Sequence, residues 1–262
     1  MTIRFTLVGG PTAVLEIGGL RIITDPTFDE PQTFTGPGTE PTNGITKTTA
    51  PALGPGEIGS IDIALVSHDH HIDNLDISGR EFLKGVPIVF TTPAGALRLG
   101  EGAVGLNDYG SVQVPLPSGG EMTVTGVPAH HGPEGVHQMA GPVVGFVLSG
   151  EDLPTVYISG DNSNLELVRD IANTFPNIDM AVLFVGGASF EEIAGGVLLT
   201  MSNADAVEIA GIMDSAIVVP VHADGWAHLS QNANQLRDAF REAGIESRAV
   251  VVEPGATADL NL

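Results

Sequence analysis

The chain has 262 residues, 42% of them hydrophobic, and its 32 acidic against 10 basic side chains give a net charge of −22. Such an acidic surface repels phosphate backbones and anionic membranes, which argues against nucleic acid or a membrane as partner. The absence of cysteine excludes disulfides and thiolate metal ligands. No apolar run approaches the roughly 18 residues of a membrane span, and the first residues resemble a strand more than a signal peptide. We therefore expect a cytoplasmic protein.

Short apolar segments predict strands along most of the chain. The first three lie at 4–9, 13–18 and 20–24 and form a meander with glycine-rich turns. The later ones lie at 61–66, 86–92, 121–127, 143–148, 155–159, 179–185 and 215–221. Helical patterns at 163–173, 201–213 and 229–243 separate the later strands. Strands thus dominate first and then alternate with helices. This order favours an α/β fold in one domain, 1–262, with two packed sheets and outer helices.

Residues 26–56 differ from the rest of the chain because they are rich in Pro, Gly and Thr and have almost no periodicity. A loop of this length inside a compact domain is usually functional and often forms a lid beside a site. A passive surface loop has the same composition, so both interpretations stay open.

All eight histidines fall in three short segments, 68–71, 130–137 and 222–228, each directly after a predicted strand. Two aspartates, Asp25 and Asp161, follow strands in the same way. A rigid sheet can aim residues at its strand ends toward one point. Imidazole and carboxylate groups bind Zn²⁺ and similar ions, and an open coordination position activates water. Each motif alone is weak, because an Asp-Asn pair also fits a turn, but the ordered set predicts a metal site.

The order of these motifs resembles that of the metallo-β-lactamase superfamily over nearly the whole chain. GGPTAVLEIGGLRIITDP resembles the opening of the L-ascorbate-6-phosphate-lactonase-like branch, with Asp25 at the position of that branch's aspartate. SHDHHIDNLD resembles the metal loop, VPAHH the third-histidine motif, YISGDN the bridging-aspartate motif and VPVHADGWAH the final-histidine motif. In VPAHH the spacing favours His131 as ligand, with His130 as its neighbour. The resemblance implies an αββα sandwich, in agreement with the predicted sheets and helices.

The resemblance also implies a ligand set for one or two divalent ions, Zn²⁺ with Mn²⁺ or Fe²⁺ as alternatives. Its members are His68, His70, Asp73, His131, Asp161 and His222. In this assignment Asp161 bridges the ions, while Asp73 and His222 face the second ion. Asp25 supports the site from behind by orienting a ligand histidine through its ring N–H.

Two departures from the superfamily pattern concern this set. Gly10 stands where many relatives have a histidine, and the metal loop carries one extra residue, so Asn74 occupies the place of a second-site histidine. An amide oxygen is a harder and weaker donor than imidazole. Three outcomes are open: a weak or empty second site, an oxygen-preferring ion such as Mn²⁺ on Asn74, or His71 recruited from the inserted position.

The resemblance implies a hydrolase in which a metal-bound hydroxide, held by Asp73, attacks a small ester, lactone, amide or phosphodiester. His228 is a candidate proton donor to the leaving group, although it also fits a cap for a helix that begins near Leu229. Only Lys47 and Arg80 are placed to bind a phosphate, which favours a neutral or weakly charged small-molecule substrate.

A non-catalytic metal-binding or sensing protein that keeps the fold is the alternative, and Asn74 favours it. Asp73 and Asp161 argue against it, because a structural site is usually closed by four ligands with no open position. A homo-oligomer is compatible with the resemblance, but no feature of the sequence decides the oligomeric state.

Overall fold

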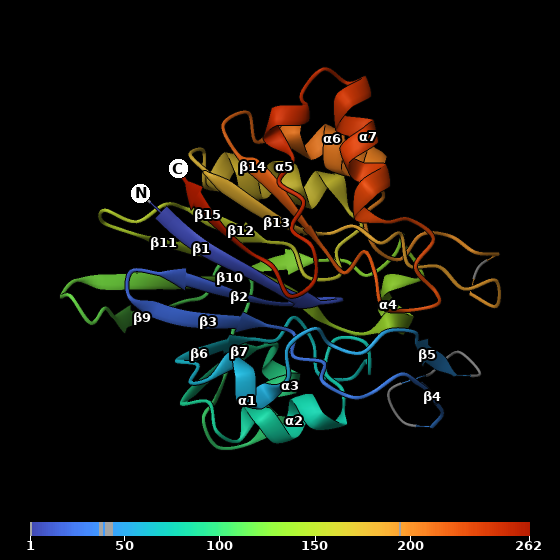
Figure 1. The fold of residues 1–262 in the computed structure, drawn as a ribbon, viewed down its shortest axis with the longest axis horizontal. Helices are drawn as coiled ribbons and strands as arrows, with labels where there is room; N and C mark the ends of the chain where they lie inside the picture. The colour runs from blue at the N-terminus through green and yellow to red at the C-terminus, as the bar shows by residue number, and fades with distance from the viewer. Residues whose placement is uncertain (1, 37–38, 40–43, 194) are drawn as a thin grey trace.

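The computed structural model describes residues 2–36, 39, 44–193 and 195–262. Within these residues two large sheets pack face to face, and helices cover the outer face of each (Figure 1). The strand orders are β15-β1-β2-β3-β6-β7-β8 in the first sheet and β14-β13-β12-β11-β10-β9 in the second. The predicted four-layer αββα sandwich is therefore confirmed.

The first sheet combines the N-terminal meander with parallel strands. Its strands are β1 (Thr2–Gly9), β2 (Thr12–Ile17), β3 (Leu20–Thr24), β6 (Ile63–Leu65), β7 (Ile88–Thr91), β8 (Ala103–Gly105) and β15 (Thr257–Asn261). From β3 through β8 neighbouring strands run parallel, so their carboxyl ends meet at one edge. The outer face is covered by α1 (Pro55–Ile58), α2 (Ile77–Leu83) and α3 (Pro93–Leu99) (Figure 1).

The second sheet contains β9 (Ser111–Pro115), β10 (Glu121–Ala129), β11 (Val143–Gly150), β12 (Val156–Ile158), β13 (Met180–Phe184) and β14 (Ile217–Val221). Because β11 is antiparallel to both β10 and β12, strands β10, β12, β13 and β14 all point the same way. Its outer helices are α5 (Leu165–Thr174), α6 (Asn203–Ile212) and α7 (Ala233–Glu242). The short α4 (His137–Ala140), the 3₁₀ helix Glu246–Arg248 and the ribbon of β4 (Gln32–Phe34) and β5 (Ile45–Lys47) complete the described elements.

Burial explains why the central strands are continuously apolar. All five residues of β13 are buried, because one face of this strand meets the first sheet and the other meets the outer helices. Strand β1 instead alternates, with Ile3, Phe5 and Leu7 directed into the core between the sheets. The apolar face of α7 buries Leu236 and Phe240 against the second sheet.

The structure corrects two expectations. The helix predicted at 229–243 begins only at Ala233, because the Asn232 side chain accepts hydrogen bonds from the backbone N–H groups of Asn234 and Gln235 and so caps it there. The 26–56 loop contains the β4–β5 ribbon and the first two residues of α1, although its residues 37–38 and 40–43 lie outside the described part.

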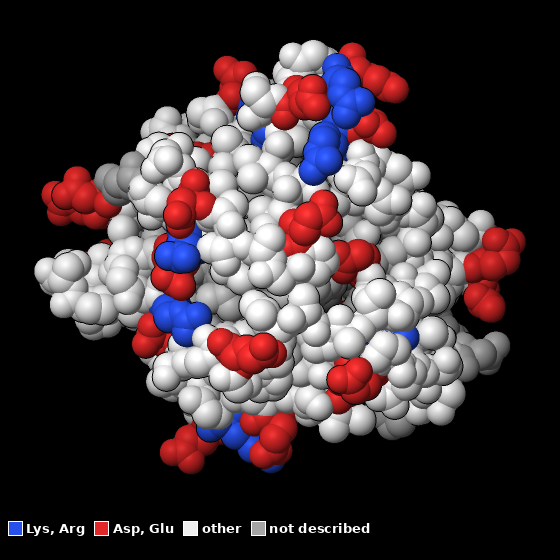
Figure 2. All heavy atoms as spheres, in the orientation of Figure 1, with Lys and Arg blue, Asp and Glu red and all other residues white. Residues whose placement is uncertain are grey.

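The distribution of charged side chains on the surface agrees with the acidic composition of the chain. On the face shown in Figure 2, the described basic side chains form small groups beside acidic ones and make no continuous basic surface. In the part of the chain that the structure describes, every helix is too short or too polar to cross a bilayer.

Candidate metal centre

Five of the predicted strand-end positions meet at one edge of the sandwich. The metal loop follows β6, His131 follows β10, Asp161 follows β12 and His222 follows β14, while Asp25 follows β3. Because these strands share one direction within each sheet, their carboxyl ends deliver the side chains to the same cleft between the sheets.

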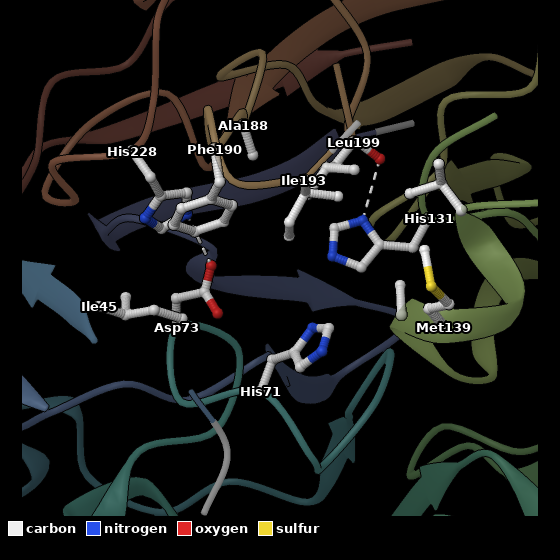
Figure 3. Close-up of a pocket in the computed structure, with 12 residues that line it drawn as sticks. Ile45, His71, Asp73, His131, Met139, Ala188, Phe190, Ile193, Leu199 and His228 are labelled. Atoms are coloured by element: carbon white, nitrogen blue, oxygen red, sulfur yellow. Dashed lines mark hydrogen bonds and ion pairs between the residues drawn. The ribbon is translucent and has the colours of Figure 1, made fainter. Parts of the chain in front are cut away.

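A first group of donors consists of His68, His131 and Asp161, which are all buried and whose ligand atoms lie within 4.8 Å of one another. Asp161 Oδ2 lies 3.9 Å from His68 Nε2 and 3.6 Å from His131 Nε2. His131 Nδ1 lies 2.9 Å from the carbonyl oxygen of Leu199 and, facing an acceptor, donates to it (Figure 3). This hydrogen bond leaves the lone pair of Nε2 directed at Asp161 and the centre.

His70 and His71 lie beside this first group. His68, His70 and His71 also bring one ring nitrogen each within 4.8 Å of the others, and His68 Nε2 lies 2.9 Å from His71 Nδ1. His70 Nε2 donates to the carbonyl oxygen of Ala140 at 2.7 Å, while its Nδ1 is buried without a hydrogen-bond partner. His71 therefore lies beside the first donor group. The sequence had left open that His71 is instead a ligand of a second metal ion.

A second group consists of Asp73, His222 and His228, whose ligand atoms are again within 4.8 Å of one another. Asp73 Oδ2 lies 3.0 Å from His228 Nε2 and 3.5 Å from His222 Nε2. Asp161 joins the two groups, since its Oδ1 lies 3.7 Å from His222 Nε2. A bridging role for Asp161 is thus compatible with its position.

Unpartnered atoms in this centre indicate that a cation belongs there. Both carboxylate oxygens of Asp161 and both ring nitrogens of His222 are buried without a hydrogen-bond partner. Leaving one such group unsatisfied costs about 1–3 kcal/mol, so native structures rarely tolerate several together. Imidazole nitrogens and shared carboxylates are the donors that Zn²⁺ and related ions take. The residues present therefore fit one or two divalent ions.

The electrostatics of the centre are consistent with this interpretation. Burial, reinforced by the neighbouring His71, holds the pKa of His68 well below its usual value, so its imidazole is neutral and free to ligate. Burial would lower the pKa of His222, but the charges of Asp161 and Asp73 outweigh it and raise this pKa to about 9. In the metal-free protein a proton on His222 therefore balances the carboxylates, and a bound ion would take over that role.

Asp25 supports the centre, but through a residue that the sequence analysis missed. Its carboxylate accepts hydrogen bonds from the Ser67 backbone N–H at 2.6 Å and the Ser67 hydroxyl at 2.7 Å. The Ser67 hydroxyl in turn lies 2.9 Å from His68 Nδ1. Burial raises the pKa of Asp25 to about 7. Asp25 therefore orients a ligand histidine indirectly, and only the position of Ser67 directly before His68 could have indicated this.

The structure also places two further positions singled out in the sequence, Gly10 and His130, the latter a candidate for supporting the metal centre. His130 does not reach the centre, because its ring stacks on His137 at a centroid distance of 3.9 Å and its Nδ1 contacts Asn164. At Gly10 the backbone has a φ of +57°, and an added Cβ would lie 3.1 Å from Nε1 of Trp226. Trp226 thus fills the space that a side chain at position 10 would occupy.

A pocket opens directly above the two donor groups (Figure 3). His71, Asp73, His131 and His228 form the polar side of this pocket. Its apolar side includes Ile45, Val136, Met139, Phe190, Ile193 and Leu199. Ile45 comes from the 26–56 loop, which makes that loop part of the pocket wall. The apolar residues between β13 and α6 have no periodicity, so the sequence did not identify them as pocket residues.

His228 does not cap a helix, because α7 begins at Ala233, several residues further on. Its ring instead stacks on Phe190 at a centroid distance of 4.8 Å and an angle of 18° and points toward Asp73 (Figure 3). The cap interpretation of this histidine is therefore wrong.

Comparison with known proteins agrees with the fold and the centre. The family model described as a beta-lactamase superfamily domain matches residues 20–223. A metal-dependent hydrolase of Methanosphaerula palustris is 30% identical over 189 residues, which are 70% of this chain and 75% of the relative. The structure of an isothiocyanate hydrolase from Delia radicum gut bacteria has a TM-score of 0.82 at 20% identity, covering 97% of this chain and 98% of that one. A structure from Veillonella parvula, described as a possible metal-dependent hydrolase, has a TM-score of 0.82 at 19% identity, covering 99% and 100% of the two chains. The chain therefore belongs to the metallo-β-lactamase superfamily and is a metallo-hydrolase.

Proposed function

We propose that this metallo-hydrolase cleaves a small, uncharged and largely apolar substrate, such as an ester, a lactone or an amide, at a centre of one or two divalent ions. The observation that carries the substrate class is the pocket wall, which is apolar except where it meets the candidate ligands. The nitrogen-rich donor set favours Zn²⁺, with Mn²⁺ and Fe²⁺ as alternatives.

The candidate ligands divide the work between binding and positioning. His68, His70, His131 and Asp161 are proposed to hold the first ion, and Asp161 is proposed to bridge to the second. A bound divalent ion lowers the pKa of water to about 7 and stabilises negative charge that develops on the substrate. The protein contributes a buried setting, in which such charge stabilisation is larger than in water.

Asp73 is proposed to orient the attacking water by accepting one of its hydrogen bonds. Burial alone would raise the pKa of Asp73, but the neighbouring His222 and His228 hold it well below its usual value. Asp73 is therefore ionised at neutral pH and can accept. Its carboxylate faces the pocket beside His71 and His228, where a substrate would lie (Figure 3).

The described lining of this pocket contains no Lys or Arg. Lys47 is only 4% exposed and bonds Asp76 at 3.2 Å, and Arg80 donates to the carbonyl oxygen of Asp69. Lys47 and Arg80, the two basic residues that the sequence offered for binding a phosphate, are thus already bonded to other groups of the protein. This argues against a phosphodiester substrate. An isothiocyanate, which the similar structure from Delia radicum gut bacteria is named for hydrolysing, is also a small uncharged electrophile.

Selectivity between matched substrates tests this proposal. We expect the Zn²⁺-loaded protein to hydrolyse an uncharged aryl ester with a kcat/KM at least about tenfold above that for the same ester carrying a carboxylate, since an unpaired buried charge is costly. Met139 lines the pocket and is 66% exposed, so Met139→Arg places a cation at the pocket entrance. We expect this cation to reduce the difference in kcat/KM between the uncharged and the anionic ester.

Leu97→Arg is the matched control, because Leu97 is 87% exposed on α3 and does not line the pocket. The measurement is kcat/KM for both esters with all three proteins. A wild-type preference for the anionic ester, or the same change in both variants, contradicts the proposed substrate class.

Four further properties stay predictions. The core shared by both sheets supports one domain over 1–262. The cytoplasmic location, the homo-oligomer and the likeness to the lactonase-like branch rest on the sequence alone.

A further inference from the structure

The second ion position needs a donor to replace the histidine that Asn74 displaces. The Asn74 side chain is fully buried, and its Nδ2 donates to Asp25 Oδ2 at 3.3 Å. The amide therefore faces the aspartate that, through Ser67, orients His68. Because this contact fixes Asn74 on the Asp25 side of the loop, the question becomes which side chain faces Asp73 and His222.

His228 is the side chain found there. Its Nε2 lies 3.0 Å from Asp73 Oδ2, closer than the 3.5 Å that separates His222 Nε2 from the same oxygen. Asp161 Oδ1 lies 3.7 Å from His222 Nε2 on the far side. Two imidazoles and two carboxylates thus converge, which is a sufficient donor set for a four-coordinate Zn²⁺ or a related ion.

The fold holds His228 in this orientation. The ring stacks on Phe190, and its side chain is only 5% exposed. The backbone carbonyl of His228 accepts a hydrogen bond from the Ser189 N–H at 3.0 Å, which ties the 222–228 turn to the segment after β13. A histidine that merely covered the pocket would not require a buried ring aimed at a carboxylate.

We propose that His228 is a ligand of a second divalent ion, together with Asp73, His222 and the bridging Asp161. It supplies the imidazole that the metal loop lacks at Asn74. Asn74 is then a positioning residue for Asp25 and not a ligand. This role replaces the proton-donor role predicted for His228, and it rests on the metal centre of the proposed function.

Zn²⁺ binding to the metal-depleted 262-residue chain tests this proposal. The stoichiometry is measured by calorimetric titration and by elemental analysis after desalting. We expect two ions on the wild type and one on His228→Gln, with the affinity of the second site lowered at least about a hundredfold. His228→Gln preserves the bulk of the side chain, and His228→Ala repeats the test with the ring removed.

Two variants serve as comparisons. Asn74→Ala is expected to keep two ions, because the Asn74 Nδ2 is bonded to Asp25 and His228 supplies the donor beside Asp73, although the Asn74 Oδ1 is itself buried without a partner. His137→Gln, in α4 and outside both donor groups, is expected to match the wild type. Thermal unfolding of the metal-free proteins identifies any variant that has not folded.

The proposal is overturned if the wild type binds a single ion or if both His228 variants still bind two ions. It is also overturned if Asn74→Ala loses the second ion while the His228 variants keep that ion. These outcomes are independent of turnover. A protein that binds two ions as expected but hydrolyses no uncharged ester, lactone or amide would instead contradict the proposed function.

Discussion

Asp161→Asn is expected to lower kcat/KM for the best substrate at least about a hundredfold. Changing a residue that only hydrogen-bonds to a metal ligand already costs about 10–100-fold, and Asp161 is proposed to be a ligand itself. Asp161 is 1% exposed, and both of its oxygens are buried without a hydrogen-bond partner. These oxygens face His68 and His131 on one side and His222 on the other. An amide in the same place has one weak oxygen donor and cannot bridge two ions.

The same variant is expected to stay folded when metal-free, because Asn has the shape of Asp and the lost charge faces no basic side chain other than histidine. Asp152→Asn is the matched control: Asp152 is exposed and has a φ of +58°, a conformation that Asn adopts readily. Activity, metal content and thermal unfolding are measured for all three proteins. Wild-type activity and metal content in Asp161→Asn would rule out the bridging role.

Gly79→Ala is expected to destabilise the protein by about 3 kcal/mol, although alanine is normally the better helix former. An added Cβ would lie 1.8 Å from the carbonyl oxygen of Pro26, a backbone atom that cannot rotate away. Gly79 belongs to α2, which the side chain of Asp76 caps directly after the metal loop. Because Pro26 directly follows Asp25, a shift of Pro26 also moves Asp25, which orients His68 through Ser67. We therefore expect the metal affinity to fall as well.

Gly211→Ala is the matched control, because Gly211 lies in α6 and an added Cβ would meet no atom within 4 Å. This change is expected to stabilise the protein by about 0.5–1 kcal/mol through the lower entropy of the unfolded chain. Urea unfolding gives both free energies of unfolding. An equal effect of the two substitutions would show that the contact between α2 and Pro26 is unimportant.

The sequence predicted strands where burial alone decides the pattern. β13 is apolar throughout because both of its faces are covered, and this signal is local. β15 was missed because it is a mostly exposed edge strand, stabilised by pairing with β1 at the other end of the chain. No local pattern records such a pairing, so an edge strand of polar residues looks like a loop.

The candidate site was predictable for a related reason. His68, His131, Asp161 and His222 each follow an apolar strand, and strands of one direction bring their ends together. The place of His228 was not predictable, because it depends on how the turn after β14 folds back against the segment after β13.

Metal dependence of the hydrolysis tests the proposed metal centre directly. The metal-depleted chain is titrated with Zn²⁺ while bound metal and hydrolysis of an uncharged aryl ester are followed in the same samples. We expect hydrolysis to be absent without metal and to rise in proportion to ions bound at the site of His68, His131 and Asp161. Hydrolysis that persists without metal, or a chain that binds no ion, would show that the protein does not work as a hydrolase with a metal at this centre.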